Sequence, residues 1–405
     1  MAKSIAIIGG GAAGFFTAIN IAMKSSYYSI TIFEASNKLL SKVLVSGGGR
    51  CNVTNVISNP RELANYYPRG HNYLEPVFKR FTTTDTQNWF KNQGILLKNE
   101  SDGRIFPKSD SSQTIYNCFV QNAKEFGVNV KLKHRLIKMI YTQGQWKLNF
   151  NNTNTKHDIV ILATGINSGI LNIINDLAIP SVKPVPSLFT FNSKNHRQKQ
   201  LSGLSVPNAL VSINQIPSRI ENGPLLITHW GYSGPSILKL SSWLAIEMEA
   251  HNYEFTLTIN WNNYDLKSLN ELLSSFVKNN LKQKVKNWNG HNLPKRLWLD
   301  LFELAGFKEY VNWSEIGKKG ISKLINLLTK YEVEIRGKST HKEEFVSAGG
   351  INLDSLDTDS FAIKNHKNLY AVGELLNIDA LTGGFNFQAA WSGSYIISEH
   401  LSSNS

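Results

Sequence analysis

The sequence predicts an α/β protein with a separate β-rich part, because strand and helix patterns alternate at both ends of the chain and strand-like runs fill the middle. The apolar run SIAII (4–8) leads through a glycine-rich turn into an apolar, helix-like stretch (15–23) and a second strand-like run (29–33). From 184 to about 260, short β-type runs are separated by Pro, Gly and Asn. A chain of 405 residues is long enough for two or three domains.

The composition excludes several classes of protein. With 41% hydrophobic and 18% charged residues, the chain is not disordered, fibrous or a coiled coil. It lacks a run of 18 apolar residues, so we expect no transmembrane helix and no membrane partner. The apolar N-terminus resembles a signal peptide, but its glycine-rich centre favours a buried strand and turn, and we expect a cytoplasmic protein. Cys51 and Cys118 stand in no CxxC or Cys/His cluster, which argues against a disulfide scaffold and a metal site.

The other elements follow in order along the chain. Residues 38–55 are loop-rich, 83–93 and 113–126 have helical patterns, 128–140 alternates as strands do, and DIVILATG (158–165) indicates a buried strand.

The second half of the chain changes character twice. Helix formers at helical spacing fill 266–328, with one helix beginning at Pro294, and the C-terminus returns to a strand, a glycine-rich turn and a helix at 387–400. We therefore expect five segments: a first domain in two parts (1–183 and 346–405), a β-rich domain in two parts (184–262 and 329–345) and a helical insert (263–328).

The N-terminal glycines fit a dinucleotide-binding fingerprint. Gly9 makes the tight turn, Gly11 lets the backbone approach a pyrophosphate, and Gly14 lets helix and strand pack closely, with Ala12 and Ala13 between them. Glu34 and the adjacent Ala35 follow the second strand, where a carboxylate accepts hydrogen bonds from adenosine ribose hydroxyls and disfavours a 2′-phosphate. A glycine-rich turn alone also occurs without a ligand.

Segments far downstream favour FAD over NAD. Ala163, Thr164 and Gly165 close a strand with residues small enough for a cofactor to lie against the backbone. Gly373 and Glu374 end another strand, and a Gly-Gly turn then opens a helix whose N-terminus favours phosphate: Gly383, Gly384, Phe385, Asn386 and Phe387. Each piece alone also suits an ordinary strand end or helix cap. Together they suit a long cofactor held by both ends of the chain.

Three runs carry a resemblance to a known family: KVLVSGGGRCNVTN (42–55), THWGYSGP (228–235) and the GE…TGGFNFQAAW tail. They resemble the bacterial BaiN/YhiN-like flavoproteins, also described as an aminoacetone-oxidase-like family, over nearly the whole chain. The resemblance implies an α/β fold with a discontinuous Rossmann-like FAD-binding domain, interrupted by a β-barrel-like domain that carries a helical insert. It implies further cofactor-binding residues: Lys42, Ser46, Gly47, Gly48, Gly49, Arg50, Cys51, Asn52 and Leu136.

The resemblance also implies an activity. The family is reduced by a nicotinamide cofactor, NADH or NADPH, and includes a ribosomal-RNA dihydrouridine synthase. A uridine of large-subunit ribosomal RNA would then be reduced by hydride transfer from flavin N5 to C6, with Cys51 or His229 as the acid that protonates C5. Two other functions stay open: a small-molecule flavin oxidase or reductase acting on an amine or an unsaturated carbonyl compound, and a non-catalytic, flavin-containing RNA-binding factor.

Three candidate residues have competing structural interpretations. The Arg50 guanidinium suits pyrophosphate oxygens but also a structural ion pair. The Cys51 thiol could protonate a substrate, or it could be a small packed residue. His229 stands in a Gly/Ser/Pro-rich turn where loops present chemistry, or it is a satisfied structural histidine.

The net charge of +13 suggests a polyanionic partner, here ribosomal RNA, although a solvated lysine-rich surface would look the same. We expect Lys282, Lys284 and Lys286 to lie on an exposed helical arc, and Trp288, His291 and Trp298 to form helix core. We also expect a monomer or a weak oligomer. Three acid-free stretches carry the basic residues Lys131, Lys133, Arg135, Lys138, Lys147, Lys156; Lys183, Lys194, Arg197, Lys199, Arg219; and Lys278, Lys282, Lys284, Lys286, Lys295, Arg296.

Overall fold

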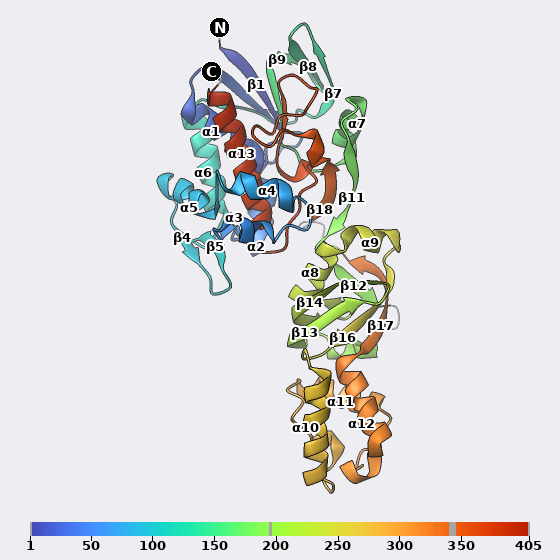
Figure 1. Cartoon of the computed structure of the whole chain (residues 1–405). Helices are drawn as coiled ribbons and strands as arrows, with labels where there is room; N and C mark the ends of the chain where they lie inside the picture. The colour runs from blue at the N-terminus through green and yellow to red at the C-terminus, as the bar shows by residue number, and fades with distance from the viewer. Residues whose placement is uncertain (1, 194–196, 340–345, 404–405) are drawn as a thin grey trace. The chain divides into compact units, whose positions relative to one another are not determined.

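The computed structural model describes residues 2–193, 197–339 and 346–403 and divides the chain into two units (Figure 1). The first unit comprises Met1–Pro186 and His341–Ser405, and the second comprises Ser187–Thr340. Each unit has a buried hydrophobic core of its own. From the sequence we predicted these two boundaries after residues 183 and 345. Lys194, which belongs to the second basic stretch, lies outside the described residues.

A five-stranded parallel sheet is the centre of the first unit, in the order β19-β10-β1-β2-β6. In β1, Ile7 lies opposite Ile32 of β2 and Ile161 of β10. Such runs of buried aliphatic residues are typical of parallel strands that are covered on both faces. The strands are β1 (Lys3–Ile8), β2 (Tyr28–Phe33), β6 (Asn129–Lys131), β10 (Ile159–Leu162) and β19 (Leu369–Ala371).

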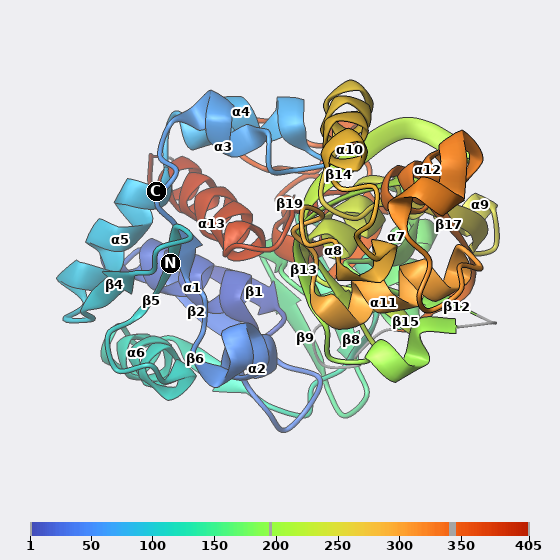
Figure 2. The ribbon, with the colours of Figure 1, turned by 90° about the horizontal axis from the view of Figure 1, so that it is seen from below.

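Helix α1 (Ala12–Lys24) packs on β1 and β2 of this sheet, and two further long helices, α6 (Ser112–Glu125) and α13 (Phe385–Ser403), pack against α1. Helices α1 and α13 lie side by side, although they come from opposite ends of the chain (Figures 1 and 2). The Ser394 hydroxyl of α13 donates a hydrogen bond to the carbonyl of Ala13 in α1, at 3.1 Å. The predicted two-part α/β domain, with both chain ends in one core, is therefore confirmed.

Smaller elements surround the parallel sheet. The expected loop-rich segment 38–55 is partly helical, because α2 occupies Ser41–Gly49, with non-helical backbone angles at Ser46–Gly48. The other helices are α3 (Pro60–Ala64), α4 (His71–Phe78), α5 (Thr83–Asn92) and α7 (Ser168–Asp176). The small sheets are β3-β5-β4 (Thr54–Asn55, Arg104–Pro107, Leu97–Asn99), β7-β8-β9 (Leu136–Thr142, Gln145–Phe150, Asn154–His157) and β11-β18 (Ser181–Ser187, Val346–Ile351).

The second unit contains a closed barrel in the order β12-β15-β14-β13-β16-β17. The predicted β-barrel-like fold is therefore confirmed. Closure is completed where β12 pairs with β17. Two helices, α8 (Pro235–Trp243) and α9 (Ala245–Ala250), connect barrel strands. The strands are β12 (Thr190–Ser193), β13 (Ser205–Ile213), β14 (Ile216–Ile227), β15 (Gly231–Ser233), β16 (Glu254–Asn260) and β17 (Tyr331–Ser339).

The helical insert lies between β16 and β17 and consists of α10 (Leu266–Asn279), α11 (Lys295–Leu304) and α12 (Trp313–Thr329). As predicted, Trp288, His291 and Trp298 are buried, and the last two rings stack with centroids 4.6 Å apart. The prediction that Lys282, Lys284 and Lys286 lie on one helical arc is wrong. Residues 280–284 are irregular, and Val285–Asn287 is one short 3-10 turn. No helix among the described residues is long and apolar enough to cross a membrane.

Candidate functional site

The predicted cofactor-binding segments meet at the carboxyl ends of the parallel strands. Gly9 follows β1, Glu34 follows β2, Ala163 follows β10 and Gly373 follows β19. In open α/β sheets this edge is where ligands bind. A Cβ atom on Gly9 would lie 2.6 Å from the Ala163 carbonyl oxygen, and one on Gly373 would lie 3.0 Å from the Cβ of Ala13. The first and last segments of the chain therefore line one site.

The turn before α1 has open space beside Gly11 and none beside Gly14. A Cβ atom on Gly14 would lie 2.0 Å from the Gly9 carbonyl oxygen, so only glycine lets helix and strand pack there. Gly11, the N-cap of α1, has no described atom within 4 Å of such a Cβ, and no side chain caps the helix. Open space in front of uncapped backbone N–H groups at a helix N-terminus suits a pyrophosphate.

Glu34 is held with its carboxylate facing the glycine turn. One oxygen accepts a hydrogen bond from Gly10 N at 2.9 Å, and the other accepts one from Ser36 N at 2.8 Å. A carboxylate oxygen has two lone pairs, so each oxygen can still accept a ribose hydroxyl. Ala35 is exposed beside it. Leu136 begins β7 and is buried opposite Phe150.

A polar group without a partner lies on the other side of the site. The Thr164 hydroxyl is buried and has no hydrogen-bond partner among the described residues. Beside it, Lys42 forms an ion pair with Glu374. A Cβ atom on Gly165 would lie 3.5 Å from the Glu374 carboxylate and 3.9 Å from the Lys42 ammonium. This set of hydroxyl, ammonium and carboxylate fits a polar, extended cofactor such as FAD.

The glycines of the SGGGRCN motif break α2 and leave its end open. Gly47, Gly48 and Gly49 have φ values of 57°, 67° and 82°, in the left-handed region that favours glycine. No described atom lies within 4 Å of a Cβ built on Gly48 or Gly49. The Ser46 hydroxyl donates to the Val43 carbonyl at 2.9 Å, so it is engaged within its own helix.

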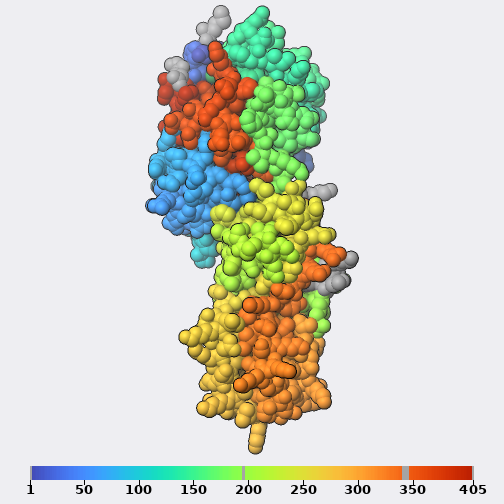
Figure 3. Space-filling view, turned by 45° about the vertical axis from the view of Figure 1, so that its right-hand side comes forward, coloured from blue at the N-terminus to red at the C-terminus, as the bar shows by residue number. Residues whose placement is uncertain are grey.

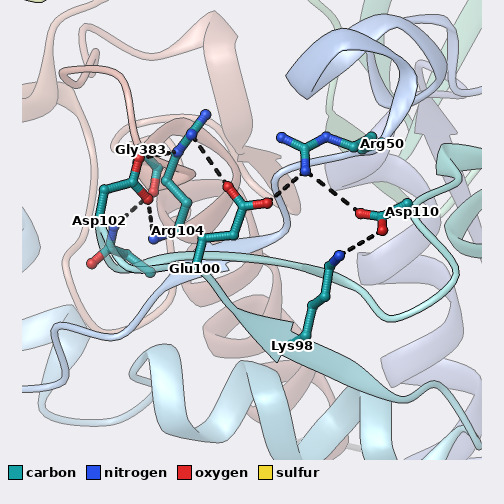
Figure 4. Close-up of polar contacts among 8 residues, drawn as sticks. Arg50, Lys98, Glu100, Asp102, Arg104, Asp110 and Gly383 are labelled. Carbon is teal, nitrogen blue, oxygen red and sulfur yellow. Dashed lines mark hydrogen bonds and ion pairs between the residues drawn. The ribbon is translucent and has the colours of Figure 1, made fainter.

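Arg50 forms ion pairs with carboxylates of the same unit (Figure 4). Its guanidinium lies 2.5 Å from Glu100 and 3.5 Å from Asp110, and 4.0 Å from the centre of the Phe106 ring. The hydrogen bond to Glu100 raises the pKa of Arg50, and the hydrogen bond from Lys98 lowers the pKa of Asp110. Of the two interpretations of Arg50, the structure contains the ion pair.

The second half of the motif positions the start of α13. With its amide oxygen toward Gly384, Asn52 accepts a hydrogen bond from Gly384 N at 2.9 Å. Asn55 donates to the Gly383 carbonyl at 3.0 Å, and Thr54 donates to Gln388 at 2.6 Å. The sequence prediction missed Thr54, Asn55 and Gln388 as members of the site. Their signal in the sequence was their place: Thr54 and Asn55 end the run KVLVSGGGRCNVTN, and Gln388 closely follows the Gly-Gly turn.

The other predicted residues of this turn have structural partners. Asn386 accepts a hydrogen bond from Ala380 N at 3.0 Å. Phe385 is buried and stacks on Tyr66 with ring centroids 4.4 Å apart, and Phe387 stacks on Trp391 at 5.4 Å. These contacts fix the path of the chain into α13, whose first turn carries no acidic residue that would repel a phosphate.

Cys51 has no exposed surface. Burial raises the pKa of its thiol to about 12, and its φ of 61° turns the side chain into the core. The thiol therefore has no contact with solvent through which a substrate could approach it. The structure therefore supports the packed interpretation of Cys51 and gives no support to a catalytic one.

His229 lies in the second unit, at the tip of the hairpin between β14 and β15. Thr228 N donates to the Gly231 carbonyl at 2.9 Å and Gly231 N donates to the Thr228 hydroxyl at 3.1 Å, which closes the hairpin. A Cβ atom on Gly231 would lie 2.0 Å from the Phe191 carbonyl oxygen, so this turn requires glycine. The His229 imidazole is exposed and packs edge-on against Trp230, with ring centroids 4.3 Å apart. The side chain of His229 is therefore open to solvent at the surface of the second unit.

Comparison with known proteins assigns this architecture to a family. The pattern of the family described as HI0933-like protein Rossmann domain matches residues 3–400. The chain is 28% identical over 404 residues to a ribosomal RNA dihydrouridine synthase of Haemophilus influenzae, covering 96% of each chain. It is 27% identical to the protein of that name from Escherichia coli, covering 98% of this chain and 97% of that one.

Two further similarities are more distant. A 3-dehydro-bile acid delta(4,6)-reductase of Clostridium scindens is 23% identical, with 97% of each chain covered. A crystal structure of 3-ketosteroid delta1-dehydrogenase from Sterolibacterium denitrificans matches the whole of both chains with a TM-score of 0.50 and 10% identity. At that identity the match concerns the fold alone.

Proposed function

Because this chain belongs to the HI0933-like Rossmann family of FAD-dependent oxidoreductases, we propose that it reduces a uridine of large-subunit ribosomal RNA to dihydrouridine, with NADH or NADPH as reductant. The observation that carries the proposal is the similarity, along nearly the whole length, to two proteins named ribosomal RNA dihydrouridine synthase. The site at the carboxyl edge of the parallel sheet supports the cofactor.

In this proposal the first unit binds FAD with four groups of atoms. The uncapped N–H groups behind Gly11 bind the pyrophosphate, and Glu34 accepts the ribose hydroxyls. Thr164 and the Lys42–Glu374 pair provide polar partners farther along the cofactor, and the Gly383–Gly384 turn presents the N-terminus of α13. When bound, FAD supplies hydride transfer, first from the nicotinamide and then to C6 of the pyrimidine.

Reduction of a uracil C5–C6 double bond needs one hydride at C6 and one proton at C5. We assign the proton to His229, because its side chain is exposed and the hairpin that carries it is closed by hydrogen bonds between Thr228 and Gly231. Cys51 has no part in this step because it is buried. The target base has to leave its stack to reach a buried cofactor, which costs less in a single-stranded or loop region.

A small-molecule reductase is the second candidate, and the similarity to the bile acid reductase favours it. The two candidates differ in one measurement. Ribosomal RNA from a strain that lacks this gene should lack one dihydrouridine by nucleoside mass spectrometry, and the wild-type gene should restore it. A Gly11→Ala gene, made as a full-length folded protein, should not restore it. Unchanged dihydrouridine in the deletion strain would favour the small-molecule reductase.

A further inference from the structure

The three-stranded sheet β7-β8-β9 of the first unit has one buried face and one exposed face. Trp146 and His157 lie opposite each other on the buried face, and Met139 and Leu148 form another buried pair. The alternate positions point the other way. The outer face, defined by the cross-strand pairs, consists of Lys138, Ile140, Lys147, Asn149, Asn154 and Lys156.

This outer face carries only one sign of charge. Lys147 lies directly opposite Lys156, and Lys138 lies on the neighbouring strand. The chain has no acidic residue between Glu125 and Asp158, and none of these three lysines has an ion pair among the described residues. Two lysines directly opposite each other in a sheet repel, which destabilises the pairing.

The barrel strands show the usual arrangement for comparison. There, Glu254 lies opposite Arg336, and Arg219 pairs with Glu221 at 2.6 Å. The charges of these two pairs are compensated within the protein. The outer face of β7-β8-β9 lacks such compensation, so a partner that brings negative charge would relieve its repulsion.

We infer that the outer face of β7-β8-β9 binds the phosphate backbone of the RNA substrate. This inference rests on the proposed function. Lysine ammonium groups act as point charges toward phosphates, and the amides of Asn149 and Asn154 can bond to phosphate or sugar oxygens. Ile140, which is 48% exposed, offers an apolar contact beside them. The segment lies at the surface of the protein, in teal at the top of Figure 3. Such contacts hold the RNA without reading its sequence.

Two double variants of equal charge test the inference. Lys147→Gln/Lys156→Gln removes two lysines of the outer face. Lys79→Gln/Lys98→Gln removes two lysines that each have a carboxylate partner, Glu75 at 3.6 Å and Asp110 at 2.5 Å. Binding of a labelled single-stranded RNA is measured against salt concentration for both variants and the wild type, with bound flavin and NADH oxidation as controls of integrity.

We expect the slope of log affinity against log salt to fall in magnitude by about 1.4–1.8 in the outer-face variant, since each phosphate contact contributes about 0.7–0.9. The control variant should keep the wild-type slope. Equal slopes in the two variants, with salt-dependent binding by the wild type, would overturn this inference and leave the proposed function standing. If the wild type binds no RNA in a salt-dependent manner, both fail.

A second readout does not depend on RNA. Because the outer-face variant removes a repelling pair, its melting temperature at low salt should equal or exceed that of the wild type. A lower melting temperature would mean that the two lysines stabilise the free protein, and would overturn the argument from uncompensated charge.

Discussion

The Thr54 hydroxyl donates a 2.6 Å hydrogen bond to the side-chain oxygen of Gln388, which is 334 residues away in the sequence. The Thr86 hydroxyl donates to the same oxygen at 2.9 Å, and all three side chains are buried. The Gln388 amide donates in turn to the Ser392 hydroxyl at 3.0 Å. The segment after the SGGG turn therefore holds the first turns of α13 in place. The role of this part of the KVLVSGGGRCNVTN run is to position α13.

Two alanine substitutions in the glycine turn should separate binding from folding. Gly11→Ala meets no described atom within 4 Å, so the protein should fold and lose FAD, because the new methyl group occupies the space of the pyrophosphate. Gly14→Ala puts a Cβ atom 2.0 Å from the Gly9 carbonyl oxygen, so it should destabilise the fold itself. Flavin absorbance per protein and thermal denaturation measure the two effects. A folded Gly11→Ala protein with stoichiometric flavin would contradict the assignment.

The Cys51→Ala variant should keep its turnover. The Cys51 thiol has no exposed surface and a pKa of about 12, so at pH 8 only about one in ten thousand such thiols is ionised. Cys118 is also buried, with a pKa of about 12. Native protein should therefore resist a thiol reagent at pH 8, and unfolded protein should react at both cysteines. Loss of turnover in a folded, flavin-containing Cys51→Ala protein would restore the thiol as a candidate acid.

His229→Asn should lower turnover on RNA by about 10²–10⁴-fold, the usual contribution of a general acid. The hairpin closes through Thr228 and Gly231, so the variant should keep its fold and its flavin. Reduction of the flavin by NADH, measured by stopped-flow absorbance, should stay at the wild-type rate. If RNA turnover is equally unaffected, another group delivers the proton.

His157 should make the protein less stable in mild acid. Burial lowers its pKa from the usual 6.5 to about 4, so the unfolded chain takes up a proton before the folded one does. Its contribution to stability is present above pH 6.5 and is lost as the pH falls toward 4, by at most about 2 kcal/mol between pH 7 and pH 5. Urea unfolding of the wild type and of His157→Gln at both pH values measures this loss. An equal loss in the two proteins would contradict the assignment to His157.

Local patterns in the sequence predicted the elements that depend on neighbours along the chain. The turn from Gly9 to Gly14 and the acid Glu34 belong to one strand–helix–strand unit, whose spacing is fixed by short connections. The same holds for the individual barrel strands, which Pro, Gly and Asn residues separate in the sequence, and for the burial of Trp288 and Trp298.

Contacts between distant segments could not be predicted in this way. Arg50 has the chemistry for a pyrophosphate, but its partner Glu100 comes from a hairpin 50 residues downstream. Arg69 forms an ion pair with the fully buried Asp379, and no pattern near either residue indicates the other. Cys51 follows three glycines with positive φ and is fully buried, and a motif of small residues does not reveal on which side of the turn the thiol lies.

A reconstituted reaction shows directly whether this chain reduces uridine in ribosomal RNA. Purified, flavin-loaded protein is incubated with NADH or NADPH and ribosomal RNA from the deletion strain, and dihydrouridine is measured by nucleoside mass spectrometry. We expect dihydrouridine at one position, in proportion to the nicotinamide consumed, and none without protein or with the Gly11→Ala variant. Nicotinamide oxidation without any dihydrouridine in the RNA would contradict the proposed function.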